Sequence, residues 1–384
     1  MRVAFYAPMK APDDPVPSGD RTIGRLFMRA LEFAGHQPEI VCRFRSRDGG
    51  GDAARQARIG SVGLRLAGHI AERIARRPVD RQPRAWLTYH VYHKAPDWLG
   101  PAVADALDIP YLIAEASSAP KQAGGRWDHG YRAANDAIAR ADAVLSLNSD
   151  DLNCLYPLVR QPVLMRRLWP FIETAPFAAA AERRAAHRAD LARRHALDPA
   201  KPWLLAVGMM RPGDKEASYR RLAAALARLA GRDWTLLVAG DGPARGDIVR
   251  TLEAAIPGRP RHLGLVPEGE LPALYAACDL LTWPAVREAF GMALVEAQAA
   301  GLPVVACATR GVPDVVSAGV SGLLPAPDDD AAFAAAVARL LDDPARRAEM
   351  GRVARRLATE RHDIAYAAGL LDATLAVLRH KRLN

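Results

Sequence analysis

The clearest alternation of apolar and polar segments lies in the second half of the chain. Apolar runs of strand length alternate there with segments of helix length. The apolar runs lie at residues 201–208, 234–240, 262–266, 280–283 and 303–306. The predicted helices lie at residues 219–230, 271–277 and 291–300. Such alternation predicts a buried parallel sheet covered by helices. Ligands of these sheets bind at the carboxyl ends of the strands. The loops after Gly208, Gly240, Trp283 and Ala308 are therefore expected to share one edge.

The first half shows the same rhythm less cleanly. Strand-like runs lie at residues 2–7, 39–42, 85–89, 110–114 and 141–146, with helices at 22–34 and 131–140. A chain of 384 residues is too long for one ordinary core, so we expect two α/β domains. The first covers residues 1–168, a linker with two prolines covers 169–200, and the second covers 201–364. The helical segment within 365–384 follows a complete second domain and is expected to pack back on the first.

The segment from Glu288 to Glu296 holds the strongest chemical signal. The helix predicted at 291–300 contains only Glu296 and Gln298 as polar residues, so it must be mostly buried. A buried carboxylate needs a partner, and a pair of ligand hydroxyls is one. The helix start near Phe290 and Gly291 offers backbone amides to an anion. The alternative is purely structural: Glu288 caps the helix and Glu296 pairs with a core arginine.

Composition and charge narrow the class of protein. There is no apolar run of about 18 residues, and the apolar run at the N-terminus is too short for a signal peptide, which favours the cytoplasm. The four cysteines lack metal or disulfide spacing. A net charge of +9 suits anionic partners, but no aromatic-interleaved basic stripe points to nucleic acid. The acidic run 328–330 is expected to cap a helix and not to bind a metal.

At this point the motifs carry a resemblance. Glu288-Ala-Phe-Gly291 and residues 296–306, 311–316 and 319–324 resemble glycosyltransferase family 4, the retaining group 1 enzymes, over most of residues 203–345. The first domain is matched weakly. The resemblance implies the α/β GT-B fold, with two Rossmann-like doubly wound domains facing each other across a cleft. A nicotinamide dehydrogenase is disfavoured, because no Gly-x-Gly-x-x-Gly follows the first strand.

The resemblance also implies roles on the donor side. Glu288 would touch the sugar hydroxyls and Glu296 the ribose hydroxyls, while Arg211 and Lys215 would bind the diphosphate, although the arginine is displaced from the family pattern. Together with Glu288 these two cations are the expected catalytic groups, without a metal or other cofactor. The remaining donor-binding residues are expected to be Gly208, Gly240, Phe290, Gly291, Met292 and Ala293.

The acceptor side departs from the family. Glu115 stands where the family often has a histidine, His90 and His93 follow the preceding strand, and Asp20 lies in the loop 8–21. These four residues are the acceptor-side candidates. The acceptor itself, a glycan, a lipid-linked molecule or a small molecule, stays open.

The expected function is a metal-independent retaining glycosyltransferase that uses a nucleotide sugar. A catalytically silent nucleotide-sugar-binding protein and a sugar-nucleotide epimerase remain as alternatives. The basic segments 55–77 and 182–195 have apolar residues at helical spacing, so peripheral contact with an anionic membrane is a hypothesis beside an ordinary surface helix. The nucleotide base, the sugar and the oligomeric state cannot be inferred from these patterns.

Overall fold

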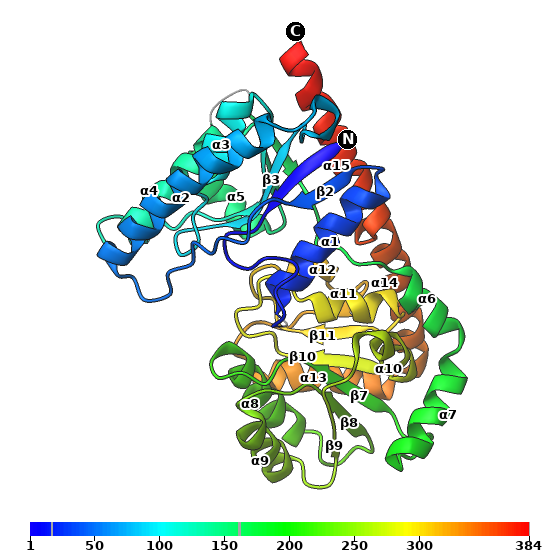
Figure 1. Ribbon diagram of the computed structural model, residues 1–384. Coiled ribbons are helices and arrows are strands. Elements are labelled where there is room, and N and C mark those ends of the chain that lie inside the picture. The colour runs from blue at the N-terminus through cyan, green and yellow to red at the C-terminus, as the bar shows by residue number, and fades with distance from the viewer. Residues whose placement is uncertain (17, 160–162, 384) are drawn as a thin grey trace. The chain divides into compact units, whose positions relative to one another are not determined.

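The computed structural model describes residues 1–16, 18–159 and 163–383, which divide into two compact units. Unit 1 comprises residues 1–169 and 364–384, and unit 2 comprises residues 170–363. Each unit contains a six-stranded sheet in which every pairing is parallel. Figure 1 shows both sheets with their helices.

The sheet of unit 1 has the strand order β2-β1-β3-β4-β5-β6. Its strands are β1 (Arg2–Tyr6), β2 (Gln37–Ile40), β3 (Trp86–Val91), β4 (Tyr111–Ala116), β5 (Ala143–Ser146) and β6 (Leu164–Arg167). Its helices are α1 (Gly19–Phe33), α2 (Ala53–Ala75), α3 (Gly100–Leu107), α4 (Asp128–Arg140), α5 (Ser149–Leu155) and α15 (Ile364–Leu383), with 3-10 turns at Val79–Arg81 and Pro120–Gln122.

The sheet of unit 2 has the order β12-β11-β10-β7-β8-β9. Its strands are β7 (Trp203–Val207), β8 (Thr235–Ala239), β9 (Pro260–Gly264), β10 (Leu280–Trp283), β11 (Val304–Ala306) and β12 (Gly322–Leu323). Its helices are α6 (Ala175–Glu182), α7 (Arg184–His195), α8 (Asp214–Ala227), α9 (Arg245–Ala255), α10 (Leu271–Ala277), α11 (Met292–Ala299), α12 (Val312–Val315), α13 (Asp330–Asp342) and α14 (Pro344–Arg361), with a 3-10 turn at Glu268–Glu270.

The C-terminal helix α15 packs on α1 within unit 1 (Figure 1). Its buried residues recur at helical spacing, namely Ile364, Ala367, Ala368, Leu371, Leu375 and Leu378. This spacing gives the helix one apolar stripe. The apolar stripe of α1, which includes Ile23, Phe27 and Leu31, is buried as well. The last helix of the chain therefore completes the core of the first unit.

Three predicted helix starts were wrong. Helix α4 begins at Asp128 and not at residue 131. Helix α1 begins at Gly19 and not at residue 22, because the Ser18 side chain caps it by accepting from the amide of Arg21. Helix α8 begins at Asp214 and not at residue 219. Its first turn is polar, so apolar periodicity could not reveal it. Strand β2 also lies two residues earlier than predicted, at Gln37–Ile40.

Candidate functional site

The loops that follow the central strands of unit 2 interlock through close backbone contacts. Gly240 has φ 151°, and a Cβ there would lie 2.0 Å from the carbonyl oxygen of Gly208. A Cβ on Gly242 would likewise meet the Met210 carbonyl oxygen at 2.4 Å. Only glycine fits such approaches without a shift of the backbone. Gly208 and Gly240 thus hold two loops together at the carboxyl edge, while their contact with a donor stays a prediction.

The loop after β10 is held in a strained conformation. Ala285 and Arg287 have φ values of 57° and 49°, a left-handed conformation that costs a non-glycine residue about 1–2 kcal/mol. Two hydrogen bonds fix the loop: the amide of Val286 donates to Ser218 Oγ at 3.0 Å, and Thr309 Oγ1 donates to the Ala285 carbonyl at 2.7 Å. Strain retained by surrounding contacts is typical of functional loops.

Lys215 and Glu288 meet at this edge. Lys215 Nζ lies 2.5 Å from Glu288 Oε2, and the same oxygen accepts a 3.3 Å hydrogen bond from Trp283 Nε1. The ammonium group also lies 5.5 Å from the centre of the Trp283 ring. Glu288 therefore does not cap the following helix, as the structural alternative had it. It forms a fixed pair with a cation at the strand ends.

The ring of Tyr219 packs against the ring of Trp283. The two rings meet edge to face at 4.9 Å, and the Tyr219 hydroxyl donates to the Gly208 carbonyl at 2.9 Å. Both side chains are buried. The Lys215–Glu288 pair therefore lies beside two buried aromatic rings that pack against each other.

The start of α11 presents free backbone donors. Gly291 has φ 67°, and a Cβ there would lie 2.7 Å from Leu294 Cδ1, so this turn requires glycine. The amides of Met292 and Ala293 donate no hydrogen bond within the described part of the chain, as is normal for the first turn of a helix. These amides and the positive end of the helix dipole favour an anion beside Phe290.

Glu296 lies within α11 and is half-buried. Its Oε2 accepts a 2.7 Å hydrogen bond from the hydroxyl of Tyr275, which lies on α10. Burial raises the pKa of Glu296 to about 7, although the bond from Tyr275 acts in the opposite direction. The other carboxylate oxygen forms no hydrogen bond in the described residues, so the partner is a tyrosine and not the core arginine of the structural alternative.

The two predicted diphosphate cations differ in their surroundings. Lys215 sits in the first turn of α8 and is paired with Glu288. Arg211 is exposed, and its guanidinium makes no ion pair with any described residue. An exposed arginine of this kind can change its side-chain conformation to contact an anion. No ion pair with a described residue fixes the Arg211 guanidinium before an anion binds.

A second cluster lies in unit 1, at the carboxyl edge of its sheet. His90 is on β3 and Glu115 on the adjacent β4, close to the register pairs Tyr89–Ala114 and Val91–Ala116. Asp20 comes from the first turn of α1. His90 Nδ1 lies 2.8 Å from Asp20 Oδ1, and His90 Nε2 lies 3.7 Å from Glu115 Oε1. The structure thus brings together three of the four acceptor-side candidates.

Burial and charge oppose each other in this cluster. Burial alone would lower the pKa of His90, but Glu115 and Asp20 outweigh it and raise that pKa to about 9. Burial raises the pKa of Glu115 to about 7 despite the neighbouring His90. Both His90 and Glu115 have a positive φ, at 64° and 62°. Strained residues with perturbed pKa values at strand ends indicate a functional site.

Two buried polar atoms of the cluster belong to side chains that interact with each other, yet neither atom forms a well-aligned hydrogen bond in the described chain. They are Glu115 Oε2 and the hydroxyl of Tyr89. Buried polar atoms are normally satisfied, so the pair has capacity to bind a ligand hydroxyl or a water in addition to the contact between its two members. Tyr92 stacks on the His90 ring at 4.8 Å and adds an apolar wall.

His93 does not belong to this cluster. Its ring packs edge to face with Trp127 at 5.9 Å, and no contact joins it to Asp20 or Glu115. Burial, together with Lys94 and Lys121, lowers the pKa of His93 to about 4. The histidine is therefore neutral near pH 7, and its acceptor role stays a prediction.

Four site residues escaped the sequence analysis: Trp283, Tyr219, Tyr275 and Tyr89. Each is an aromatic residue on an apolar strand or helix, where core packing is the ordinary explanation. The position of Trp283 at a strand end just before Glu288 was the one available signal. The helix cap predicted for the acidic run is confirmed, since Asp329 caps α13 by accepting from the amide of Ala332 at 2.8 Å.

A comparison with protein families finds a match within unit 2. Residues 201–343 match the family model of the group 1 glycosyl transferases. Residues 201–343 of unit 2 are therefore similar to the group 1 glycosyl transferases. The match covers the interlocked loops, the Lys215–Glu288 pair and α11.

Two curated relatives extend the comparison. The 2-deoxystreptamine glucosyltransferase of Streptomyces kanamyceticus is 40% identical over 158 residues, which are 40% of this chain and 41% of that protein. A D-inositol 3-phosphate glycosyltransferase of Salinispora tropica is 33% identical over 287 residues, 71% of this chain and 58% of that protein. The matched part spans about half the length of these relatives.

Solved structures identify the fold. Anabaena Alr3699/HepE, in complex with UDP and glucose, matches with a TM-score of 0.69 at 18% identity, over 97% of this chain and 99% of that chain. At this identity the likeness shows the fold alone. Two parallel six-stranded sheets with flanking helices are the GT-B fold.

Proposed function

We propose that the protein is a retaining glycosyltransferase that moves a sugar from a nucleotide-sugar donor to an acceptor hydroxyl. The observation that carries the proposal is the arrangement at the carboxyl edge of unit 2. There the Lys215–Glu288 pair lies at the strand ends, the free amides of α11 follow in the same loop, and Glu296 lies within that helix. One edge thus offers a cation, an anion-binding helix start and two acceptors for hydroxyl groups.

The chemistry of the leaving group fits these residues. Breaking the bond between the anomeric carbon and a diphosphate leaves a cation-like sugar and adds negative charge to the phosphates. Lys215, the amides of Met292 and Ala293, and the exposed Arg211 would stabilise that charge, and such preorganised groups lower the barrier. They supply the electrostatic role that a metal ion has in other transferases, so we propose that no metal is required.

The two glutamates divide the donor between them. Glu296 would accept hydrogen bonds from the ribose hydroxyls, with Tyr275 fixing its other oxygen. Glu288, held by Lys215 and Trp283, would accept from the sugar hydroxyls. The complex of Alr3699/HepE with UDP and glucose favours a uridine nucleotide as the first donor to test.

The acceptor would be recognised by unit 1. The buried carboxylate of Glu115 and the neighbouring hydroxyl of Tyr89 are suited to a hydroxyl-bearing molecule. The names of the curated relatives mention 2-deoxystreptamine and D-inositol 3-phosphate, which favours a small-molecule acceptor over a polymeric glycan.

A lipid-linked acceptor at an anionic membrane is the less favoured proposal. No helix in the described residues has the length and apolar character needed to cross a bilayer. The apolar face of α2 is largely used inside unit 1, where Ile70, Ala71 and Ile74 are buried, although Leu64 is exposed. Sedimentation with anionic vesicles at low salt tests the idea, and a protein that stays in the supernatant would rule it out.

A thermal-shift screen tests the donor site. UDP, GDP, ADP and their sugars are each added to the wild type and to Lys215→Ala, with Lys201→Ala as the matched control. Lys201 pairs with Asp233 at the opposite end of β7, at 3.0 Å. We expect one nucleotide to raise the melting temperature of the wild type and of the control, and to raise that of Lys215→Ala much less. If no nucleotide stabilises the wild type, the donor-site assignment fails.

A further inference from the structure

A basic cavity lies at the amino edge of the unit 2 sheet, opposite the strand ends that hold Lys215 and Glu288. Its volume is about 340 Å³. The segments just before β10 and β11 form its floor, and α7 and α14 form its sides. Ligand pockets usually start at about 300 Å³, so the cavity suits a small ligand.

Close packing of two helices shapes this cavity. A Cβ on Gly351 of α14 would lie 2.2 Å from the carbonyl oxygen of Gly301, which follows the C-cap of α11. The Cβ of Arg355 lies 3.9 Å from the position that a Cβ on Gly301 would occupy. The contact brings the arginines of α14 against the segment before β11.

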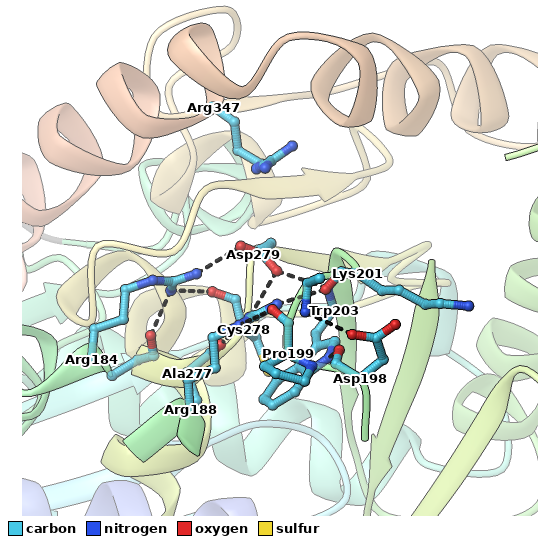
Figure 2. A network of polar contacts seen from close by, with 12 residues as sticks. Arg184, Arg188, Asp198, Pro199, Lys201, Trp203, Ala277, Cys278, Asp279 and Arg347 are labelled. Carbon is cyan, nitrogen blue, oxygen red and sulfur yellow. Dashed lines mark hydrogen bonds and ion pairs between the residues drawn. The ribbon is translucent and has the colours of Figure 1, made fainter. Parts of the chain in front are cut away.

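Asp279, the one carboxylate among the described residues that line the cavity, already has hydrogen-bond partners. Figure 2 shows Asp279 between Arg184 and Arg188. Asp279 Oδ1 accepts from Arg184 Nη2 at 2.7 Å, and Asp279 Oδ2 accepts from Arg188 Nη1 at 2.9 Å and from the amide of Trp203 at 2.7 Å. Both oxygens are occupied, so Asp279 has little capacity left for further cations.

The described residues that line the cavity therefore include more arginines than Asp279 can pair with. Arg347 points toward this network without joining it in Figure 2, and its Nη1 donates only to the carbonyls of Leu340 and Leu341. Burial lowers the pKa of Arg347, and repulsion from Arg184 and Arg188 adds to this effect, although attraction by Asp279 opposes it. No carboxylate within the described residues pairs with Arg347 or Arg355. Arg352 also lines the cavity, and its partner Glu349 lies outside it.

We propose that this cavity binds a small phosphate-bearing anion, held chiefly by Arg347 and Arg355. Planar guanidinium groups match phosphate oxygens in pairs, and two of them face one cavity without an anionic partner. The hydrogen bonds from Arg347 to carbonyl groups cap the end of α13. Helix capping does not account for Arg355, whose side chain forms no hydrogen bond with a described residue. The site is separate from the proposed donor site, which lies at the other edge of the sheet.

Two substitutions test the proposal, with a third as the matched control. Arg355→Gln breaks no hydrogen bond in the described chain, so it keeps the test valid if Arg347→Gln folds poorly. Arg356→Gln removes an exposed arginine on the same helix that does not line the cavity. The probes are inorganic phosphate and glycerol 3-phosphate, titrated by calorimetry. We expect Arg355→Gln and Arg347→Gln each to weaken binding by about tenfold or more, and Arg356→Gln to bind like the wild type.

Hydrogen exchange separates this cavity from the donor site. Phosphate should slow the exchange of amides in 344–356, and Arg355→Gln should abolish that effect. Vesicles of phosphatidic acid form the second arm: if they protect 344–356 and the free anions do not, the phosphate belongs to a lipid headgroup. Equal binding of all variants, with no protection of 344–356 by either probe, would overturn the proposal.

Discussion

The ionised carboxylate of Glu296 should lower the stability of the folded protein above neutral pH. The pKa of Glu296 is raised from 4.5 to about 7 by burial. The native protein therefore keeps a proton that the unfolded chain releases between these two pH values, and stability falls as the pH rises through that window. The change Glu296→Gln keeps the size of the side chain and an acceptor for the Tyr275 hydroxyl, while it removes the charge.

The size of the effect follows from the two pKa values. A difference of 2.5 between 4.5 and about 7, at about 1.4 kcal/mol for each pKa unit, gives about 3.5 kcal/mol as the cost of the ionised side chain above pH 7. We expect Glu296→Gln to raise the stability of the ligand-free protein by up to this amount at about pH 8.5, and by almost nothing at about pH 4.5. The same change should weaken nucleotide binding.

The assay compares melting temperatures of the wild type and the variant across this range of pH. Glu115 titrates in the same window, so only the difference between the two proteins is informative. Glu349→Gln, an exposed change on α14, serves as the control and should show no pH-dependent gain. A Glu296→Gln protein that is less stable than the wild type at high pH would refute the reasoning, because it would mean that the carboxylate is stabilising.

Four further predictions follow from the geometry. Lys215→Ala should weaken binding of a nucleoside diphosphate by about tenfold or more in calorimetry, since charged hydrogen bonds contribute about 1.5–3 kcal/mol; an unchanged affinity would remove this residue from the site. Gly291→Ala should cost about 1–2 kcal/mol of stability in thermal melts, because the turn requires φ 67°. Asp279→Ala should destabilise the protein by about 3 kcal/mol, since it leaves two arginines and a backbone amide without their acceptor. The raised pKa of His90 gives stability that is present below pH 6.5 and lost as the pH rises through about 9; His90→Gln should lack this loss, and a parallel pH profile would contradict it.

The sequence predicted most of unit 2, because its strands are buried and its motifs are contiguous. The helix that carries Glu296 was predicted within one residue at its start and its end, since a nearly apolar segment that ends at a glycine has few alternatives. The α8 start was missed, because the turn that holds Lys215 is polar and its partners, Glu288 and Trp283, lie about 70 residues away. A contact of that range leaves no local pattern.

The acceptor-side cluster illustrates the same limit. Asp20, His90 and Glu115 come from three segments, and each was a separate candidate in the sequence. Strand pairing of β1 with β3 and of β3 with β4 brings these segments together. The place of the Tyr89 hydroxyl beside Glu115 could not be predicted, because a tyrosine in an apolar strand looks like a core residue until its surroundings are known.

The most direct test of the central claim is the fate of a nucleotide sugar. UDP-glucose, and then the corresponding GDP and ADP sugars, are incubated with the protein, and the products are separated by chromatography. The account predicts that the protein slowly releases nucleoside diphosphate and free sugar from one donor, and that Lys215→Ala does so far more slowly while Lys201→Ala is unaffected. A donor that binds yet stays intact, or that returns as an epimer of the nucleotide sugar, would contradict glycosyl transfer.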